Sequence, residues 1–596
     1  MSQTAPEVPR PDRRLTGPAA PAQGRARKAK GPECRAKFFQ IGFNKCGTTF
    51  IARLFDMNAI PAAHWLEGAL ADDIAYARLT GAKPLARWAD RITAFTDMES
   101  VRFLNMPVIE AFRDFALLDA HYPGAVFLLN TRRVEDWIAS RYLHRDGDYA
   151  RSVAADRGVA LGDLADLWAA DWEAHLTAAR RHFGDRPEFL EIDIDHATPE
   201  DYRRALSPWF DLPRIPDLPG AGVRRARLRN LPRGARMLDA PLPGADQDPA
   251  RRDRLARRLA RLARPALLLR RAATRAPHDQ ALCLDLTEGV MRDAGGRVMP
   301  LRRGPDGRFH LDSQRPGLLR PAAVANDIAG IAREGLYWLD MRPATFAGSG
   351  PDDPAHAPLI AGLRRKGAQN LFLWPAPWHH RIGNRGFPGS TSPSPAARDA
   401  AVVWRGTLSG HDPISRLTAE AAVTALLADP GDAAARGAVT RGPRWRFLAE
   451  RAADPALDLA LLADPRRDRA LAGAGLTAPV PCAPPRAGRL HLCLSGSEGD
   501  ADLLPLAFGH ATVIRQQDGW ESFVTGLFQP WTHVIPMAED GSDLEARLAW
   551  AADHPDDCRR MSERCRRLCA GLGDPAGRRL HLSHLLADYR RATRQD

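Results

Sequence analysis

The segment that most constrains the fold is residues 38–49, where a short apolar run leads into a turn of small and polar residues. It reads Phe-Phe-Gln-Ile-Gly-Phe-Asn-Lys-Cys-Gly-Thr-Thr, and apolar residues recur at helical spacing over residues 50–55. A strand, a tight turn and a helix are predicted. The free amides of the helix, the Lys45 ammonium and the Thr48 and Thr49 hydroxyls then converge on one point. This arrangement predicts a cradle for a phosphate or a sulfate.

The order Gly-x-x-Lys-x-Gly-Thr-Thr is not a Walker A loop, in which the lysine follows the second glycine, and this argues against a nucleotide triphosphatase. It resembles the phosphosulfate-binding loop of the sulfotransferases that use 3′-phosphoadenosine 5′-phosphosulfate. The resemblance implies that this donor is bound by Gly42, Lys45, Gly47, Thr48 and Thr49. Lys45 is expected to act in catalysis as well, by neutralising the leaving phosphate.

A second strand-to-helix motif spans residues 126–140, where an apolar run breaks into a charged helix. In the same family an arginine that leaves a strand, and a serine about two helical turns later, bind the 3′-phosphate of the donor. Arg132 and Ser140 match these positions, with Arg133 as the adjacent alternative and Val134 where the family usually has proline. A surface cluster of arginines is the other interpretation. The resemblance covers residues 36–216.

Sulfuryl transfer is an in-line displacement that needs a histidine or a carboxylate to take the proton of the acceptor hydroxyl. The candidates are His64, Asp97 and Glu99. All three lie between the two motifs, where the family places its base. A structural role stays open for each of them.

The second half of the chain carries another ordered pattern. A predicted helix and strand over residues 503–514 are followed by a tryptophan at 520, by Pro-Trp-Thr-His-Val-Ile-Pro at 530–536 and by Asp-Leu at 543–544. This order resembles the lipopolysaccharide-modifying, capsule-associated glycosyltransferase family that includes the protein O-glucosyltransferases, over residues 282–589. The resemblance implies two Rossmann-like lobes of the GT-B type that hold a UDP-linked sugar nucleotide without a metal.

In that family's arrangement, Arg405 and Arg416 are expected to neutralise the diphosphate, and Asp340 is the candidate base, one residue out of register. The family's Ser-x-Arg is replaced by Gly-Asp-Ala-Asp at residues 499–502, so the usual phosphate grip is missing, and Arg515 is the possible substitute. An alternative therefore stays open, in which the protein is a monofunctional sulfotransferase with a non-catalytic glycan-binding C-terminal domain.

At 596 residues the chain is too long for one sulfotransferase domain. We expect a disordered basic tail at 1–35, a sulfotransferase domain at 36–216, a basic linker at 217–278 and a glycosyltransferase-like domain at 279–596. The linker contains an arginine-rich helix with Leu255, Leu259 and Leu262 on one face. Its basic face is either simply solvated or docks onto an anionic membrane or a polyanionic glycan.

The net charge of +12 admits a nucleic-acid-binding protein as a rival class, but aromatic residues are not interleaved with the arginines, and no nucleic acid is expected as a partner. No apolar run approaches the ~20 residues of a membrane span. The eight cysteines form no disulfide framework, which fits a reducing compartment. Cys558, Cys565 and Cys569 repeat at helical spacing, which predicts a buried stripe rather than a zinc site.

The sequence therefore predicts an α/β protein in which a P-loop-like sulfotransferase domain is fused to a two-lobed GT-B type domain. We expect a bacterial, bifunctional, cytoplasmic enzyme, peripheral at the inner face of the membrane. It would transfer a sulfuryl group from phosphoadenosine phosphosulfate, and a sugar from a sugar nucleotide, to hydroxyls of a saccharide or glycolipid acceptor.

Overall fold

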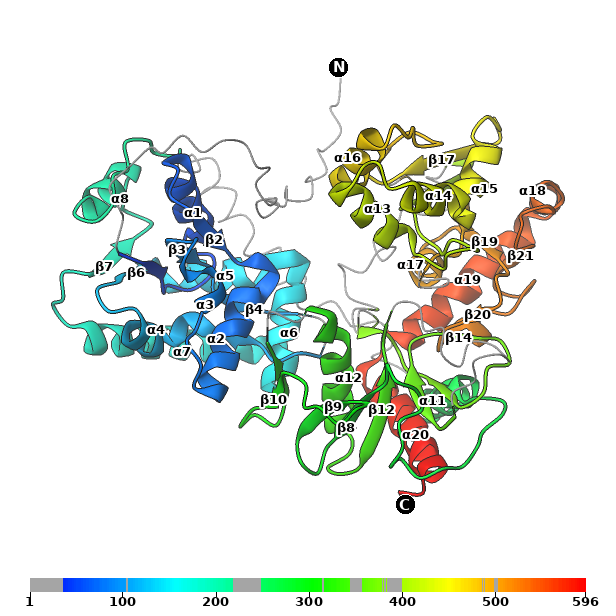
Figure 1. Cartoon of the computed structure of the whole chain (residues 1–596), viewed down its shortest axis with the longest axis horizontal. Helices are drawn as coiled ribbons and strands as arrows, with labels where there is room; N and C mark the ends of the chain where they lie inside the picture. Colours follow the sequence, from blue (N-terminus) through cyan, green and yellow to red (C-terminus); the bar gives the residue numbers. More distant parts are fainter. Residues whose placement is uncertain are drawn as a thin grey trace. The chain divides into compact units, whose positions relative to one another are not determined.

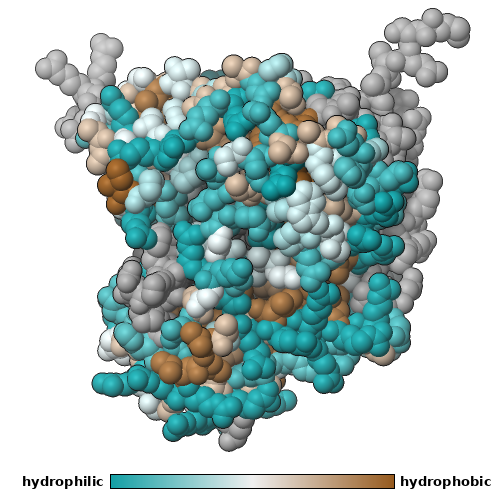
Figure 2. All heavy atoms as spheres, turned by 90° about the vertical axis from the view of Figure 1, so that its right-hand side faces the viewer, coloured by the Kyte–Doolittle hydropathy of each residue, from teal (hydrophilic) through white to brown (hydrophobic). Residues whose placement is uncertain are grey.

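The computed structural model describes residues 36–102, 105–217, 248–312, 316–342, 356–377, 399–484, 488–497 and 502–595, with residues 379, 382 and 486 (Figure 1). It is a mixed α/β structure that contains parallel sheets, as predicted for the fold class. Among the described helices, none combines the length and the apolar character needed to cross a bilayer. The face drawn in Figure 2 is mostly hydrophilic, with hydrophobic residues gathered in small separate groups.

The described residues divide into two compact units. The first is drawn from Met1–Ser100, Ile109–Arg133 and Trp172–Gly220, and the second from Val101–Val108, Val134–Asp171 and Ala221–Asp596. The division falls inside helix α7 (Leu164–Phe183). The stretch expected to form one sulfotransferase domain thus contributes to both units, and the boundary placed near residue 216 stays a prediction.

The first unit is built around one parallel sheet. Its elements, apart from α7, are β1 (Phe38–Gln40), α1 (Thr48–Met57), β2 (Ala62–His64), α2 (Ala69–Thr80), α3 (Ala86–Ala89), β3 (Ala94–Thr96), β4 (Glu99–Ser100), β5 (Ile109–Glu110), α4 (Phe115–His121), β6 (Val126–Thr131), β7 (Phe189–Asp193) and α8 (Pro199–Leu206).

The sheet has the strand order β2-β3-β1-β6-β7, and every pairing in it is parallel. Its register is fixed by a row of aromatic rings, because Phe39 stands opposite Phe95 on one side and Phe127 on the other. The rings stack with centroids 5.5 and 5.4 Å apart, and all three side chains are fully buried. Shifting any of the three strands by one residue would turn its ring to the opposite face of the sheet.

The second unit contains most of the remaining elements. They are α5 (Val134–Tyr142), α6 (Asp148–Arg157), α11 (Pro249–Ala263), β8 (Leu282–Asp285), β9 (Val290–Asp293), β10 (Leu301–Arg303), β11 (Phe309–Leu311), α12 (Leu319–Ala329), β12 (Leu336–Asp340), β13 (Leu359–Ala361), β14 (Arg364–Arg365), β15 (Leu371–Leu373), β16 (Asp399–Gly406), α13 (Ala419–Ala428), α14 (Ala433–Arg441), α15 (Pro443–Arg451), β17 (Leu457–Leu461), α16 (Pro465–Gly473), β18 (Gly488–Cys493), α17 (Leu503–Phe508), β19 (Thr512–Gln516), β20 (Trp520–Glu521), β21 (Ile535–Met537), α18 (Leu544–Asp553), α19 (Pro555–Leu572) and α20 (Pro575–Thr593).

Two five-stranded sheets lie in this unit. One has the order β15-β13-β12-β8-β9, with parallel pairings from β15 to β12 and antiparallel pairings from β12 to β9. The other has the order β17-β16-β18-β19-β21 and is parallel throughout. Numbered along the chain, the second order is 2-1-3-4-5, which is one of the two common orders of doubly wound nucleotide-binding folds.

Helix α11, the arginine-rich helix of the expected linker, packs along α20 (Figure 1). Leu259 is buried, and Leu255 and Leu262 pack partly buried against the same core, so the predicted apolar face is confirmed. Burial of this face is what holds α11 in place, since its other face is a row of exposed arginines. The helix is therefore part of the packed C-terminal half.

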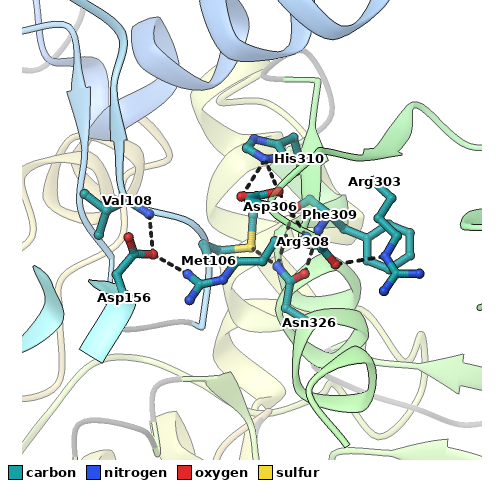
Figure 3. A network of polar contacts seen from close by, with 10 residues as sticks. Met106, Val108, Asp156, Arg303, Asp306, Arg308, Phe309, His310 and Asn326 are labelled. Atoms are coloured by element: carbon teal, nitrogen blue, oxygen red, sulfur yellow. Dashed lines mark hydrogen bonds and ion pairs between the residues drawn. The ribbon is translucent and has the colours of Figure 1, made fainter. Parts of the chain in front are cut away.

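A polar network ties α6 to the β10–β11 hairpin and α12 within the second unit (Figure 3). Asp156 of α6 accepts a hydrogen bond from the backbone N of Val108 at 3.1 Å and forms an ion pair with Arg308. Asn326 of α12 accepts from the backbone N of Phe309 at 2.7 Å and donates to its carbonyl at 3.3 Å. The ion pair between Asp156 and Arg308 attaches a helix from the first third of the chain to the C-terminal half.

Candidate active site

The predicted cradle lies at the carboxyl end of β1, where the chain turns into α1 (Figure 1). Gly47 takes a left-handed conformation, with φ 87°, directly before the helix, and Lys45 has φ 64°. Among the described residues, no side chain caps the first turn of α1, and that turn carries no acidic residue. Its amides and the positive end of the helix dipole are therefore available to an anion.

The cradle sits at a topological switch point of the first sheet. The chain leaves β1 toward β2 on one side of the sheet and leaves its neighbour β6 toward β7 on the other side. The connections after β1 and β6 therefore diverge at the carboxyl ends of the strands, which is where open α/β sheets bind ligands. Both motifs singled out in the sequence cross this end of the sheet.

Gly42 allows the turn after β1 to approach the end of β6. A Cβ atom on Gly42 would lie 2.6 Å from both the backbone N and the backbone O of Asn130, a distance that no side chain tolerates. The approach brings Arg132 to the cradle, where its NH1 donates to the carbonyl of Lys45 at 3.0 Å. Arg132 is buried, and its Nε has no acceptor among the described residues. A buried cation with an unused donor beside the cradle favours an anionic ligand.

His64, the candidate base at the end of β2, lies beside the Thr96 hydroxyl at the end of β3 and the Asp97 carboxylate directly after it. The hydroxyl Oγ1 of Thr96 donates to the carbonyl of Ala63 at 3.4 Å and lies 2.9 Å from Nδ1 of His64. The tautomer that carries its proton on Nδ1 donates to this hydroxyl and leaves Nε2 able to accept a proton. Nε2 lies 3.4 Å from Oγ1 of Thr49 and 3.8 Å from Oδ2 of Asp97.

Two buried polar side chains that were not singled out in the sequence position the cradle. Gln40 donates from Nε2 to the carbonyl of Gly42 at 2.6 Å and accepts from the backbone N of Asp97 at 3.2 Å. His175 of α7 donates from Nε2 to the carbonyl of Ile41 at 2.7 Å. Burial lowers the pKa of His175 to about 4, although this hydrogen bond partly opposes the shift. His175 is therefore neutral at pH 7.

The remaining candidates of the first half occupy different surroundings. Glu99 is buried and accepts a hydrogen bond from Asn44 at 3.1 Å, which fits a structural role. Arg133 is exposed, and its backbone N donates to Asp195 at 3.0 Å. Of the two neighbouring arginines, Arg132 is the one at the cradle. Ser140 is half-buried on α5, which belongs to the second unit.

In the second half, Arg405 is occupied by contacts within the protein. Its NH2 donates to Oδ1 of Asp458 at 2.8 Å, and Nε and NH1 donate to the backbone carbonyls of Pro484, Trp404 and Asp458. These bonds would have to break before Arg405 could hold a diphosphate. Arg416 is exposed in the loop between β16 and α13, with φ 63°.

Asp340 lies at the end of β12 and is almost fully buried. Its carboxylate accepts from Nε and NH2 of Arg342 at 2.9 and 2.6 Å, and Nε2 of His278 lies 3.3 Å away. Burial alone would raise its pKa, but the bonds to Arg342 and His278 outweigh burial and hold the pKa below the usual 3.8. This carboxylate is an ionised ion-pair partner, which makes it a weak proton acceptor.

The switch point of the second parallel sheet lies between β16 and β18, because the chain leaves them in opposite directions. Ser409, after β16, and Ser497, after β18, have hydroxyls 2.7 Å apart, and both donate to Oε1 of Glu420 at 2.8 and 2.9 Å. This hydroxyl and carboxylate cluster was not singled out in the sequence. Serines and a glutamate are too common in loops to signal a site without the sheet that brings them together.

The cysteines of α19 lie on its packed face. Cys558, Cys565 and Cys569 are all buried, as predicted for a helical stripe, and burial raises the pKa of each thiol. Within the described part of the chain, no group of three or more histidine, cysteine or carboxylate side chains is arranged to hold a metal ion.

No family model matches the chain. A segment of 74 residues, 12% of this chain, is 30% identical to the uncharacterized protein 035R of Invertebrate iridescent virus 3. A segment of 46 residues, 8% of this chain, is 37% identical to the uncharacterized protein 027R of Frog virus 3 (isolate Goorha). The matches span only 7% and 5% of those viral proteins.

Proposed function

We propose that the first half of the chain transfers a sulfuryl group from 3′-phosphoadenosine 5′-phosphosulfate to a hydroxyl of a saccharide or glycolipid. The observation that carries this proposal is the convergence of the cradle, His64 and Arg132 at one edge of the first parallel sheet. An anion site with a histidine beside it is what an in-line transfer of an anionic group requires.

In this mechanism the amides of α1, Lys45 and the hydroxyls of Thr48 and Thr49 hold the 5′-phosphosulfate. Arg132 binds the 3′-phosphate through its unused Nε. The acceptor oxygen forms a bond to sulfur while the bond from sulfur to the bridging phosphate oxygen breaks. Nε2 of His64 takes the acceptor proton, and Lys45 neutralises the charge that develops on the leaving phosphate. The products are a sulfate ester and adenosine 3′,5′-bisphosphate.

The decisive experiment compares two donors in the full-length protein. Arg132→Ala should raise the Michaelis constant for the intact donor far more than for an analogue without the 3′-phosphate. Only the intact donor has an oxyanion that binds the guanidinium, so only its binding is weakened when the guanidinium is removed. Arg133→Ala is the matched control, since this neighbour is exposed, whereas Arg132 is buried against the carbonyl of Lys45. Equal losses with both donors would mean that Arg132 has only a structural role.

For the second half we propose glycosyl transfer from a UDP-linked sugar nucleotide, supported by the parallel sheet of order 2-1-3-4-5 and its switch point. The internal bonds of Asp340 and Arg405 favour the alternative, a glycan-binding domain without catalysis. Calorimetry with UDP separates the two functions. Binding that is lost when Ser409 and Ser497 are replaced by bulky residues supports the transferase. Binding of an acceptor glycan but of no nucleotide supports the alternative.

A further inference from the structure

The basic face of α11, expected to be either solvated or docked onto an anionic partner, contributes Arg251 to the lining of a pocket. An open pocket of about 230 Å³ lies between α11 and α19 in the second unit. Liquid water occupies about 30 Å³ per molecule, so this space holds several waters or a phosphate group with part of its carrier. The lining residues are Arg251, Leu255, His533, Arg564, Arg567 and Leu568.

The pocket carries positive charge that carboxylates do not balance. Its lining contains three arginines and no acidic residue. Arg251 and Arg567 are exposed and form no ion pair within the described residues, and Arg564 donates to the carbonyl of Thr532 at 3.3 Å. Most other arginines of α19 differ, since Arg559 and Arg560, for example, pair with aspartates of their own helix.

His533, which lines the same pocket, lies close to two arginines. It is mostly buried at the wall of the pocket, and its pKa is lowered, first by burial and then by the charges of Arg258 and Arg564. The part of this shift that comes from Arg258 and Arg564 reflects their positive charge beside the ring. Leu255 and Leu568 add apolar surface to the same lining.

We propose that the pocket between α11 and α19 is a binding site for a phosphate group attached to a larger ligand. Two or three guanidinium groups from different helices would grip its oxygens, and Leu255 and Leu568 would contact the apolar part of the carrier. The site is independent of the cradle and of the proposed transfers. The phosphate could belong to a soluble ligand or to the head group of an acidic lipid, and the two sources present the same chemistry.

The test uses full-length protein and two double variants of equal charge. Arg251→Ala with Arg567→Ala removes two arginines of the pocket. Arg254→Ala with Arg261→Ala removes two exposed arginines of α11 that do not line it. None of the four side chains has a hydrogen-bonding or ion-pair partner within the described residues, and the substitutions leave the backbone bond from Arg251 to Asp248 in place. Neither double variant should therefore affect folding, which the melting temperature checks.

Pyrophosphate binding is measured by calorimetry at low and at physiological ionic strength. The pocket variant should lose at least roughly tenfold in affinity at one site, and the control variant less than about twofold. A second pyrophosphate site at the cradle would persist in both variants. Equal losses in both variants, or none in either, would overturn the proposal.

Sedimentation with phosphatidylcholine vesicles, with and without phosphatidic acid, identifies the source of the phosphate. If the wild type and the control variant bind the acidic vesicles and the pocket variant does not, the site binds a lipid head group. Pyrophosphate binding without vesicle binding assigns it to a soluble phosphate ligand. Vesicle binding that both double variants weaken equally, with pyrophosphate affinity unchanged in both, would show general surface charge and refute the site.

Discussion

The buried imidazole of His175 should make the stability of the first unit depend on pH. Its pKa is about 4 in the folded protein against the usual 6.5. At pH 7 the ring is neutral in the folded protein and mostly neutral in the unfolded chain. As the pH falls below 6.5, the His175 ring binds a proton in the unfolded chain, whereas in the folded protein it does so only near pH 4. Stability is therefore fully present above pH 6.5 and is lost as the pH falls from 6.5 to about 4.

The size of the effect follows from the separation of the two pKa values. Lowering the pH from 7 to 5 should reduce the free energy of unfolding by roughly 2 kcal/mol through this residue alone. His175→Gln has no titrating ring and should remove that part of the pH dependence. The exposed His196, with 86% of its side chain accessible, offers the matched control, and His196→Gln should leave the dependence nearly unchanged.

The assay is urea denaturation of the full-length protein at several pH values. The unfolding transition of the first unit is identified as the one that adenosine 3′,5′-bisphosphate shifts to higher urea, because a ligand stabilises the part that binds it. The same pH dependence in wild type and His175→Gln would refute the account of a neutral, buried ring. A change in His196→Gln as large as in His175→Gln would refute it as well.

Three further perturbations address the cradle and the C-terminal half. Gly42→Ala should destabilise the first unit by about 1 to 3 kcal/mol, because the added Cβ meets the backbone of Asn130. It should also weaken the binding of adenosine 3′,5′-bisphosphate. An unaltered melting temperature and affinity would contradict the close approach of Gly42 to Asn130. Lys45→Gly should leave the melting temperature unchanged or raise it, because glycine adopts the φ of 64° at this position without strain. The same variant should lose sulfuryl transfer. A folded and active variant would remove Lys45 from the proposed mechanism. Asp412 is fully buried, and hydrogen bonds from Arg441 hold its pKa well below 3.8. The stability that the ionised Asp412 carboxylate provides is present above about pH 4 and is lost in acid. Asp412→Asn should therefore make the unfolding of the C-terminal half less dependent on acid pH, as followed by circular dichroism. An unchanged pH dependence would argue against this ion pair.

Local patterns in the sequence were sufficient to predict the elements that carry the candidate sites. The strand, turn and helix around the cradle form as β1 and α1, and the second motif forms as β6 and α5. The pattern before Asp543 forms as α17, β19 and β21, and α18 begins at the next residue. These predictions succeed because apolar periodicity and glycine turns depend on residues that are close together in the sequence.

Only the tertiary structure decided which side chains meet. Arg132 and Arg133 are equivalent neighbours in the sequence, yet the sheet order places Arg132 against the Lys45 carbonyl. Arg405 has the residue type expected for a diphosphate site, but Asp458, 53 residues away, occupies it.

His175 follows the cradle by more than 120 residues, and no local signal connects it to Ile41, whereas the lone Gln40 in an apolar strand was a signal that could have been followed. The chain's local chemistry thus determined strands, helices and an anion cradle. The partners of each charged group depended on sheet order and helix packing, which arise from contacts between residues far apart in sequence.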